Sequence, residues 1–86
     1  MPEISRFLGI VIKMFVDDHN PPHFHAIYGD SDALIDIKRL SLFAGKLPPR
    51  VLGLVIEWAT LHQAELLEDW NLSQNHQPLS RIEPLQ

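Results

Sequence analysis

The chain has 86 residues, of which 45% are hydrophobic and 21% are charged, and its formal net charge is −4. These values predict one small folded domain over residues 1–86 and argue against a disordered chain. An acidic balance also makes nucleic acid an unfavourable partner, because binding to phosphates needs clustered cations. The sequence contains no cysteine, which excludes disulfides, thiolate metal ligands and cysteine nucleophiles and fits a cytoplasmic protein.

The N-terminal half is predicted to form β-strands. The first apolar stretch, residues 7–16, is interrupted by Lys13 and has no small-residue cleavage site, so we expect neither a signal peptide nor a membrane span. Within residues 4–45, β-branched and aromatic residues alternate with turn formers. The predicted strands are residues 9–16, 23–28 and 33–38, with a short fourth strand at 40–43, in an antiparallel meander of three to four strands.

The register of the central hairpin follows from its hydrophobic pattern. An even-length turn within residues 29–32 puts Phe24, Ala26 and the isoleucines of the next strand on one apolar face. His23 and His25 then share the opposite face. We expect residues 29–32 to supply this turn and His25 to face Asp36 across the strand pair.

One long helix is predicted over residues 48–76, starting at a proline pair and ending before Pro78. Its apolar arc is about twice as wide as the roughly 100° that a surface helix needs. The apolar helix surface that the sheet does not cover predicts a protein partner, either a second copy of the chain or another protein. The candidate contact residues are Leu54, Ile56, Leu61 and Leu67 on the helix, and Val11, Phe15, Ile27 and Leu34 on the mixed sheet face. The tail, residues 77–86, is expected to return along the body through Leu79, Ile82 and Leu85.

Three of the five histidines lie within seven residues, next to two aspartates and around a proline pair. His23 and His25 are two apart on a strand, so both imidazoles project from one face and could bind a divalent metal such as zinc. His19 is the third histidine candidate, with Asp18 or Asp36 as a further ligand. The competing interpretation is structural: His25 pairs with Asp36, His23 is half exposed, and His19 packs the turn.

His62 is a separate candidate. It falls within the apolar arc of the helix, between Trp58 and Leu66 at four-residue spacing. This position is typical of a core histidine satisfied by one hydrogen bond, and the alternative is a contact with the strand histidines. Glycine-rich phosphate loops and nucleophile elbows are absent from the sequence, so no catalytic residue and no organic cofactor can be assigned.

The sequence resembles the bacterial family catalogued as domain of unknown function 4160. The resemblance covers nearly the whole chain and is carried by MPEISRF at residues 1–7, DHNPPHFHA at 18–26 with Tyr28-Gly29, GKLPPR at 45–50, EWA at 57–59, Leu61-His62, ELL at 65–67, Trp70 and IEPL at 82–85. It implies a small protein that is often encoded beside a second small protein, of the domain of unknown function 2442 type. Such a pairing resembles a two-component, toxin–antitoxin-like module.

Together these observations predict an α+β domain with the helix packed on one sheet face. The expected function is a cytoplasmic protein-interaction component, either a homodimer or half of a two-gene module. The alternative is a metal-dependent hydrolase or nuclease that uses His19, His23 and His25.

Overall fold

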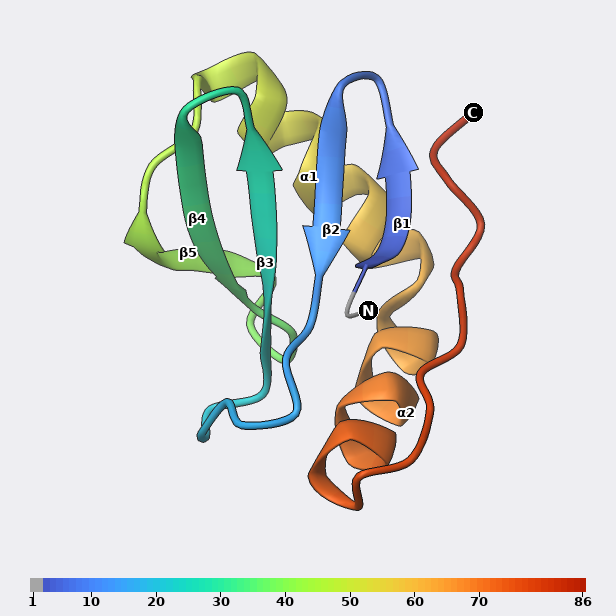
Figure 1. Ribbon diagram of the computed structural model, residues 1–86. Coiled ribbons are helices and arrows are strands. Elements are labelled where there is room, and N and C mark those ends of the chain that lie inside the picture. The colour runs from blue at the N-terminus through green and yellow to red at the C-terminus, as the bar shows by residue number, and fades with distance from the viewer. Residues whose placement is uncertain (1–2) are drawn as a thin grey trace.

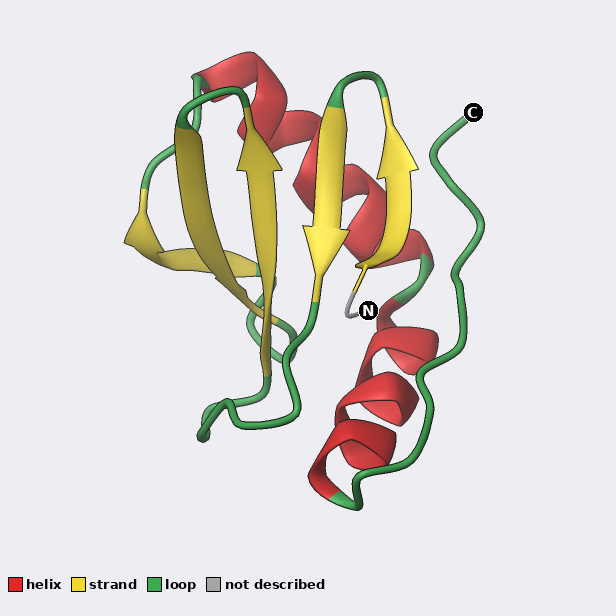
Figure 2. Cartoon of the chain, in the orientation of Figure 1, coloured by secondary structure: helices red, strands yellow, loops and turns green. Residues whose placement is uncertain are grey.

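The chain folds into one antiparallel sheet with a first helix lying across one face and a second helix continuing past the end of the strands, in a computed structural model that describes residues 3–86 (Figure 1). Each strand pairs with its neighbour in sequence, so the sheet order is β1-β2-β3-β4-β5. The elements are β1 (Glu3–Phe7), β2 (Ile10–Lys13), β3 (His23–Tyr28), β4 (Ser31–Asp36), β5 (Ser41–Gly45), α1 (Pro49–Leu61) and α2 (Gln63–Gln74). All five strands precede the helices, and an irregular tail ends the chain (Figure 2).

The α+β class and the meander are confirmed, but the sheet has one strand more than the predicted maximum of four. The additional strand is β1, which pairs with β2 through a two-residue turn at Leu8 and Gly9. Both turn residues have positive φ, 51° and 80°, as a type I′ hairpin requires. A leucine rarely takes this conformation, so Leu-Gly does not signal a hairpin as Asn-Gly would. The predicted strand at 9–16 accordingly begins at Ile10 and ends early, at Lys13.

The turn of the central hairpin has an even number of residues, as predicted, but the predicted cross-strand pairs of β3 and β4 are shifted by two residues. The turn between β3 and β4 contains two residues, Gly29 and Asp30, and not four. As a result His23 lies opposite Asp36 and His25 lies opposite Leu34, so the predicted His25–Asp36 pair is wrong. A shift of two residues leaves every side chain on the same face of the sheet, which is why both histidines still share one face.

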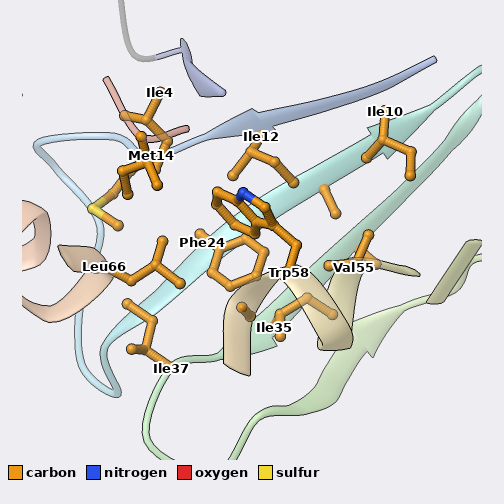
Figure 3. Close-up of a cluster of buried hydrophobic side chains, with 14 of the residues drawn as sticks. Ile4, Ile10, Ile12, Met14, Phe24, Ile35, Ile37, Val55, Trp58 and Leu66 are labelled. Atoms are coloured by element: carbon orange, nitrogen blue, oxygen red, sulfur yellow. The ribbon is translucent and has the colours of Figure 1, made fainter. Parts of the chain in front are cut away.

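The core lies between the sheet and the helices. Ile12, Phe24 and Ile35 project from three neighbouring strands toward Trp58 of α1, and all four side chains are fully buried (Figure 3). Trp58 also contacts Phe24 edge to face, with ring centroids 5.8 Å apart. The helices contribute five buried apolar side chains to this core: Val51, Val55, Trp58, Leu66 and Trp70.

The predicted single helix is interrupted at His62, whose φ and ψ of −122° and 25° are not helical. Neither glycine nor proline marks this point in the sequence. The break has a tertiary cause instead, since the Gln63 side chain donates to the carbonyl of Ile37 at 2.8 Å and to that of Lys38 at 3.3 Å. These contacts attach the start of α2 to the end of β4, and α2 then runs beyond the edge of the region covered by α1 (Figure 1).

The tail returns along the body as predicted. Ile82 is buried, and its N–H donates to the carbonyl of Ile4 at 2.8 Å, while the Trp58 indole donates to the carbonyl of Glu83 at 2.8 Å. The tail therefore covers part of the wide apolar helix arc. Of the four predicted helix contact residues, Leu54, Ile56 and Leu67 are partly buried against the core of the same chain, and Leu61 is 66% exposed.

Neither α1 nor α2 has the length and apolar character that crossing a lipid bilayer would require, within the residues that the structure describes.

Candidate metal centre

Three side chains that can bind metal converge at the N-terminal end of β3. Asp18 lies in the loop between β2 and β3, and His23 and His25 are the first and third residues of β3. Their candidate ligand atoms all lie within 4.8 Å of one another. The two imidazole centroids are 5.6 Å apart, on the face opposite Phe24, as strand alternation predicted. We call these three residues the Asp18–His23–His25 cluster.

The loop that carries Asp18 is fixed at several points. The N–H of Asp18 donates to the carbonyl of Phe15 at 3.2 Å, and the carbonyl of Asp18 accepts from the side chain of Gln74 at 3.2 Å. Further along, the carbonyl of Pro22 accepts from the N–H of Ile37 at 3.0 Å. The loop is thus tied both to the last turn of α2 and to the end of β4, which holds the Asp18 carboxylate over β3.

The hydrogen bonding of His23 determines which of its ring nitrogens can bind a ligand. Its Nδ1 lies 2.8 Å from the carbonyl oxygen of Pro21, which can only accept, so Nδ1 carries a proton. In the neutral ring Nε2 then has an unprotonated lone pair. That lone pair faces Asp18 Oδ2 at 3.4 Å. Both atoms are hydrogen-bond acceptors, so this approach is unfavourable unless a cation or a proton lies between them.

The Nε2 atom of His25 faces Asp18 as well. This atom lies 3.1 Å from the same Asp18 oxygen, and Nδ1 of His25 lies 3.8 Å from Asp32 Oδ1. Each imidazole therefore turns Nε2 toward Asp18, but only His23 has an acceptor within hydrogen-bond distance of Nδ1, because 3.8 Å between His25 Nδ1 and Asp32 is too long for a hydrogen bond. The arrangement of His23 is that of histidines that bind metals, in which an acceptor on the second nitrogen fixes the tautomer and the ring orientation.

The spacing of the donor atoms suits a small divalent ion. Two ligands about 2.0–2.1 Å from zinc at the tetrahedral angle lie about 3.4 Å apart. The two Nε2–Oδ2 distances, 3.4 Å and 3.1 Å, are close to this value. Two imidazoles and one carboxylate form the ligand set of open zinc and iron sites, in which the remaining positions take water or substrate.

Aromatic side chains surround the cluster and restrict access of water. Trp70 and Phe43 approach the His23 ring with centroids 5.3 Å and 5.4 Å away, and Phe15 contacts the His25 ring edge to face at 4.7 Å. The side chain of His23 is only 8% exposed, compared with 18% for His25 and 21% for Asp18. The cluster is therefore partly enclosed, with access from the side of His25 and Asp18.

Two of the predicted ligands are not part of the cluster. His19 is exposed and lies outside the group of converging ligand atoms. Asp36 is opposite His23, but its Oδ1 accepts the N–H groups of Lys38 at 2.9 Å and Arg39 at 2.8 Å and so fixes the following turn. The structural interpretation was also wrong in detail, because His23 is buried and His25 faces Asp18 where Asp36 had been expected.

His62 does not join the strand histidines. Its Nδ1 lies 2.6 Å from Glu65 Oε1, and its ring packs beside Trp58 with centroids 5.6 Å apart. His62 therefore has the single hydrogen bond that was predicted, but it is half-buried at the break between α1 and α2 and is not a core residue.

Sequence reasoning missed three groups that support the cluster: Asp32, Trp70 as a neighbour of His23, and Gln74. Asp32 could have been found by assuming a two-residue turn, since the shorter turn brings the start of β4 beside His25. Trp70 and Gln74 are 47 and more residues from His23 in sequence, and no local pattern indicates their contacts.

The fold and the cluster define a small α+β protein, a five-stranded meander whose central strand presents two histidines beside a loop aspartate. The family model described as Domain of unknown function (DUF4160) matches residues 9–71, and the chain belongs to this family. The matched region includes the whole cluster and both helices up to Asn71. No curated protein and no solved structure shows a significant match to the chain.

Proposed function

We propose that the Asp18–His23–His25 cluster binds one divalent metal ion, with zinc as the best fit, and that the protein is a metal-dependent hydrolase. The observation that carries the proposal is the orientation of His23. Its proton is on Nδ1, held by the Pro21 carbonyl, and its Nε2 lone pair faces a carboxylate oxygen 3.4 Å away. A cation between the two atoms turns this repulsion into two favourable bonds.

The competing explanation is an ion pair in which a proton takes the position of the metal. It accounts for the convergence on Asp18, but a single carboxylate oxygen would then serve two imidazoliums whose centroids are 5.6 Å apart. A second proton would add repulsion between the rings, whereas one divalent ion satisfies all three ligands. The acceptor on Nδ1 of His23 also favours the metal, because it fixes the tautomer in which Nε2 can be a ligand.

Three protein ligands leave at least one coordination position for water in a tetrahedral or larger shell. A bound zinc ion would activate water there for attack on an ester or a phosphate. The chain's own contribution would be to hold the ligands, through the Pro21 contact of His23 and the Gln74 contact of Asp18, and to limit bulk water through Trp70, Phe43 and Phe15. This arrangement supports hydrolysis better than a purely structural zinc site, for which a closed shell of four protein ligands is typical.

The test is metal content and zinc affinity of the protein purified without a histidine tag. We expect one equivalent of zinc by elemental analysis, and binding by calorimetry that is lost in Asp18→Asn and His25→Gln. Both replaced side chains are partly exposed, so these variants should fold. His76→Asn is the matched control, because it removes an exposed histidine and puts a residue that tolerates positive φ at a position with φ of 55°.

His19→Ala should bind zinc like the wild type, since His19 lies outside the cluster. The absence of zinc from the purified protein together with no calorimetric binding would overturn the proposal, as would unchanged binding in His25→Gln. For the hydrolase, the probe is p-nitrophenyl acetate, an activated ester. Its hydrolysis should require zinc, stop on addition of EDTA and disappear in Asp18→Asn; a zinc-loaded protein with no such activity would limit the function to metal binding.

A protein-interaction component is the second candidate function. The observation that favours it is the sheet face opposite the helices, where Val11, Ile27 and Leu34 are only half-buried and Phe15 is exposed. An apolar face of this kind fits a protein partner. Sedimentation at micromolar concentration tests it: we expect a mass above the monomer that Ile27→Lys reduces. A monomer, with no binding to the second small protein that the family resemblance implies, would remove this candidate.

A further inference from the structure

A second site lies beside the metal cluster, and Pro21 and Phe43, which contact His23, are among the residues that line it. It is a cavity of about 500 Å³, within the range that holds small organic ligands. Its lining residues are Pro21, Pro22, Asp36, Lys38, Arg39 and Phe43. None of the three cluster residues lines it. The cavity therefore needs an explanation of its own.

The cations that line the cavity are free to bind a ligand. Lys38 and Arg39 are exposed, and neither forms an ion pair with any side chain among residues 3–86. The one acid in the lining, Asp36, is buried, and its Oδ1 already accepts two backbone N–H groups. Two adjacent cations, one of them a guanidinium, match the geometry of a phosphate group.

The turn that carries these cations is held in place from three directions. Asp36 caps it through the N–H groups of Lys38 and Arg39, and the N–H of Ile37 donates to Pro22 on the opposite wall at 3.0 Å. Gln63 adds a third anchor, since its side chain donates to the carbonyls of Ile37 and Lys38. A fixed backbone reduces the entropy lost when the two side chains bind an anion.

The remaining walls are apolar and flat. Phe43 is 44% exposed on one side, and the rings of Pro21 and Pro22 form another. An exposed aromatic ring beside prolines suits a planar heterocycle, which stacks on it and buries its faces. An aromatic group and a phosphate in one cavity of this size correspond to a ligand as large as a mononucleotide.

We infer that this cavity binds a small aromatic phosphate ester, with its phosphate on Lys38 and Arg39 and its ring on Phe43. A single phosphate group does not need a basic protein, so the net charge of −4 is no obstacle. The inference does not depend on the metal. If the hydrolase proposal holds, the cavity is the adjoining binding site for the substrate class; if it fails, the cavity is a ligand site in its own right.

The probe is adenosine 5′-monophosphate, titrated into ¹⁵N-labelled protein and followed by NMR. We expect saturable shifts of the amides in the turn at residues 36–40 and of Phe43. Adenosine and inorganic phosphate, which carry only one of the two groups, should each bind more weakly. The double variant Lys38→Ala/Arg39→Ala should bind the nucleotide at least about ten-fold more weakly, because two charge-assisted contacts are lost.

The matched control is Lys46→Ala/Arg50→Ala, which removes the same charge outside the cavity lining and should bind like the wild type. Phe43→Ala should lower nucleotide affinity to that of phosphate alone. The metal ligand variant His25→Gln should keep nucleotide binding, which separates failure of this inference from failure of the metal proposal. Absence of shifts at millimolar nucleotide, or equal losses in the two double variants, would overturn the inference.

Discussion

The indole ring of Trp70 packs against the imidazole of His23 with ring centroids 5.3 Å apart, which joins the middle of α2 to the candidate metal centre. Trp70 is almost fully buried, so it limits the positions that the His23 ring can take. We therefore predict that Trp70→Leu lowers zinc affinity by about ten-fold, the lower end of what is lost when the support of a ligand is removed. Calorimetric titration of zinc into the folded variant measures this effect.

Loss of core packing alone must be separated from loss of ligand orientation. Val55→Ala is the control, since Val55 is fully buried in α1 and its replacement weakens core packing without touching the His23 ring. It should lower the free energy of unfolding and leave zinc affinity unchanged. Equal zinc affinity in Trp70→Leu and Val55→Ala would show that Trp70 is only a core residue.

The sequence predicted the parts of the fold that depend on local alternation. The histidine face of β3, the buried positions of the helices and the returning tail all follow from the period of apolar residues. The turn lengths did not follow, since Leu8 takes a positive φ that leucine disfavours, and Gly29-Asp30 could equally have been part of a longer turn. The helix break at His62 was not predictable either, because Gln63 is held by carbonyls 25 and 26 residues earlier in the chain.

In the candidate site, too, local patterns were predictable and contacts that depend on the turn length were not. Two histidines two residues apart on a strand indicated a shared face, and Asp18 was among the acids considered. The predicted pairing of His25 with Asp36 depended on the length of the turn, and the two-residue shift in pairing was left open by the sequence. His19 was favoured by its proximity in sequence, but it belongs to the loop and remains exposed.

Two glycines should respond in opposite ways to alanine. Gly45 has φ of 75°, and a Cβ there would overlap the backbone carbonyl of Asp32 on β4. Gly45→Ala should therefore destabilise the fold by several kcal/mol, roughly 2–4, through a positive-φ strain and a backbone clash. Gly53 is exposed in α1 with no atom near the position of a Cβ, so Gly53→Ala should stabilise by about 0.5–1 kcal/mol. Urea denaturation measures both; equal effects would contradict the β4–β5 pairing at Gly45.

The tail should prevent association through the helix face that it covers. Ile82 is buried, and its N–H bonds to Ile4, so Ile82→Asp should release the tail at a cost of about 2–5 kcal/mol, as for other losses of a buried isoleucine. Part of the apolar helix arc would then be exposed. We expect light scattering to show a larger mass for this variant than for the wild type at the same concentration. Leu85→Asp, at a less buried position of the tail, is the control and should have a smaller effect.

Asp69 should make stability fall as the pH rises. Its side chain is 1% exposed; Oδ1 accepts the N–H of Ser80 at 2.9 Å, and Oδ2 has no hydrogen-bond partner among the described residues. Burial, chiefly, and the nearby charges of Glu68 and Glu65 raise the pKa of this carboxyl above its ordinary 3.8. The folded state then binds more protons than the unfolded state, so stability is lost as the pH rises from 3.8 through the raised pKa.

Asp69→Asn should remove this dependence, because an amide keeps the Ser80 contact and cannot ionise. Urea denaturation at a series of pH values, compared with the wild type, isolates the contribution of Asp69. The comparison is needed because Glu3 acts in the opposite direction: hydrogen bonds from Arg6 and Arg81 lower the pKa of Glu3 to about 2, so its contribution is lost as the pH falls below 4.5. Glu68→Gln, at an exposed position of the same helix, should keep most of the wild-type pH dependence. If the free energy of unfolding of Asp69→Asn follows that of the wild type above pH 3.8, the prediction is wrong. The buried carboxyl would then ionise at no cost to stability, because a cation or water reaches Oδ2.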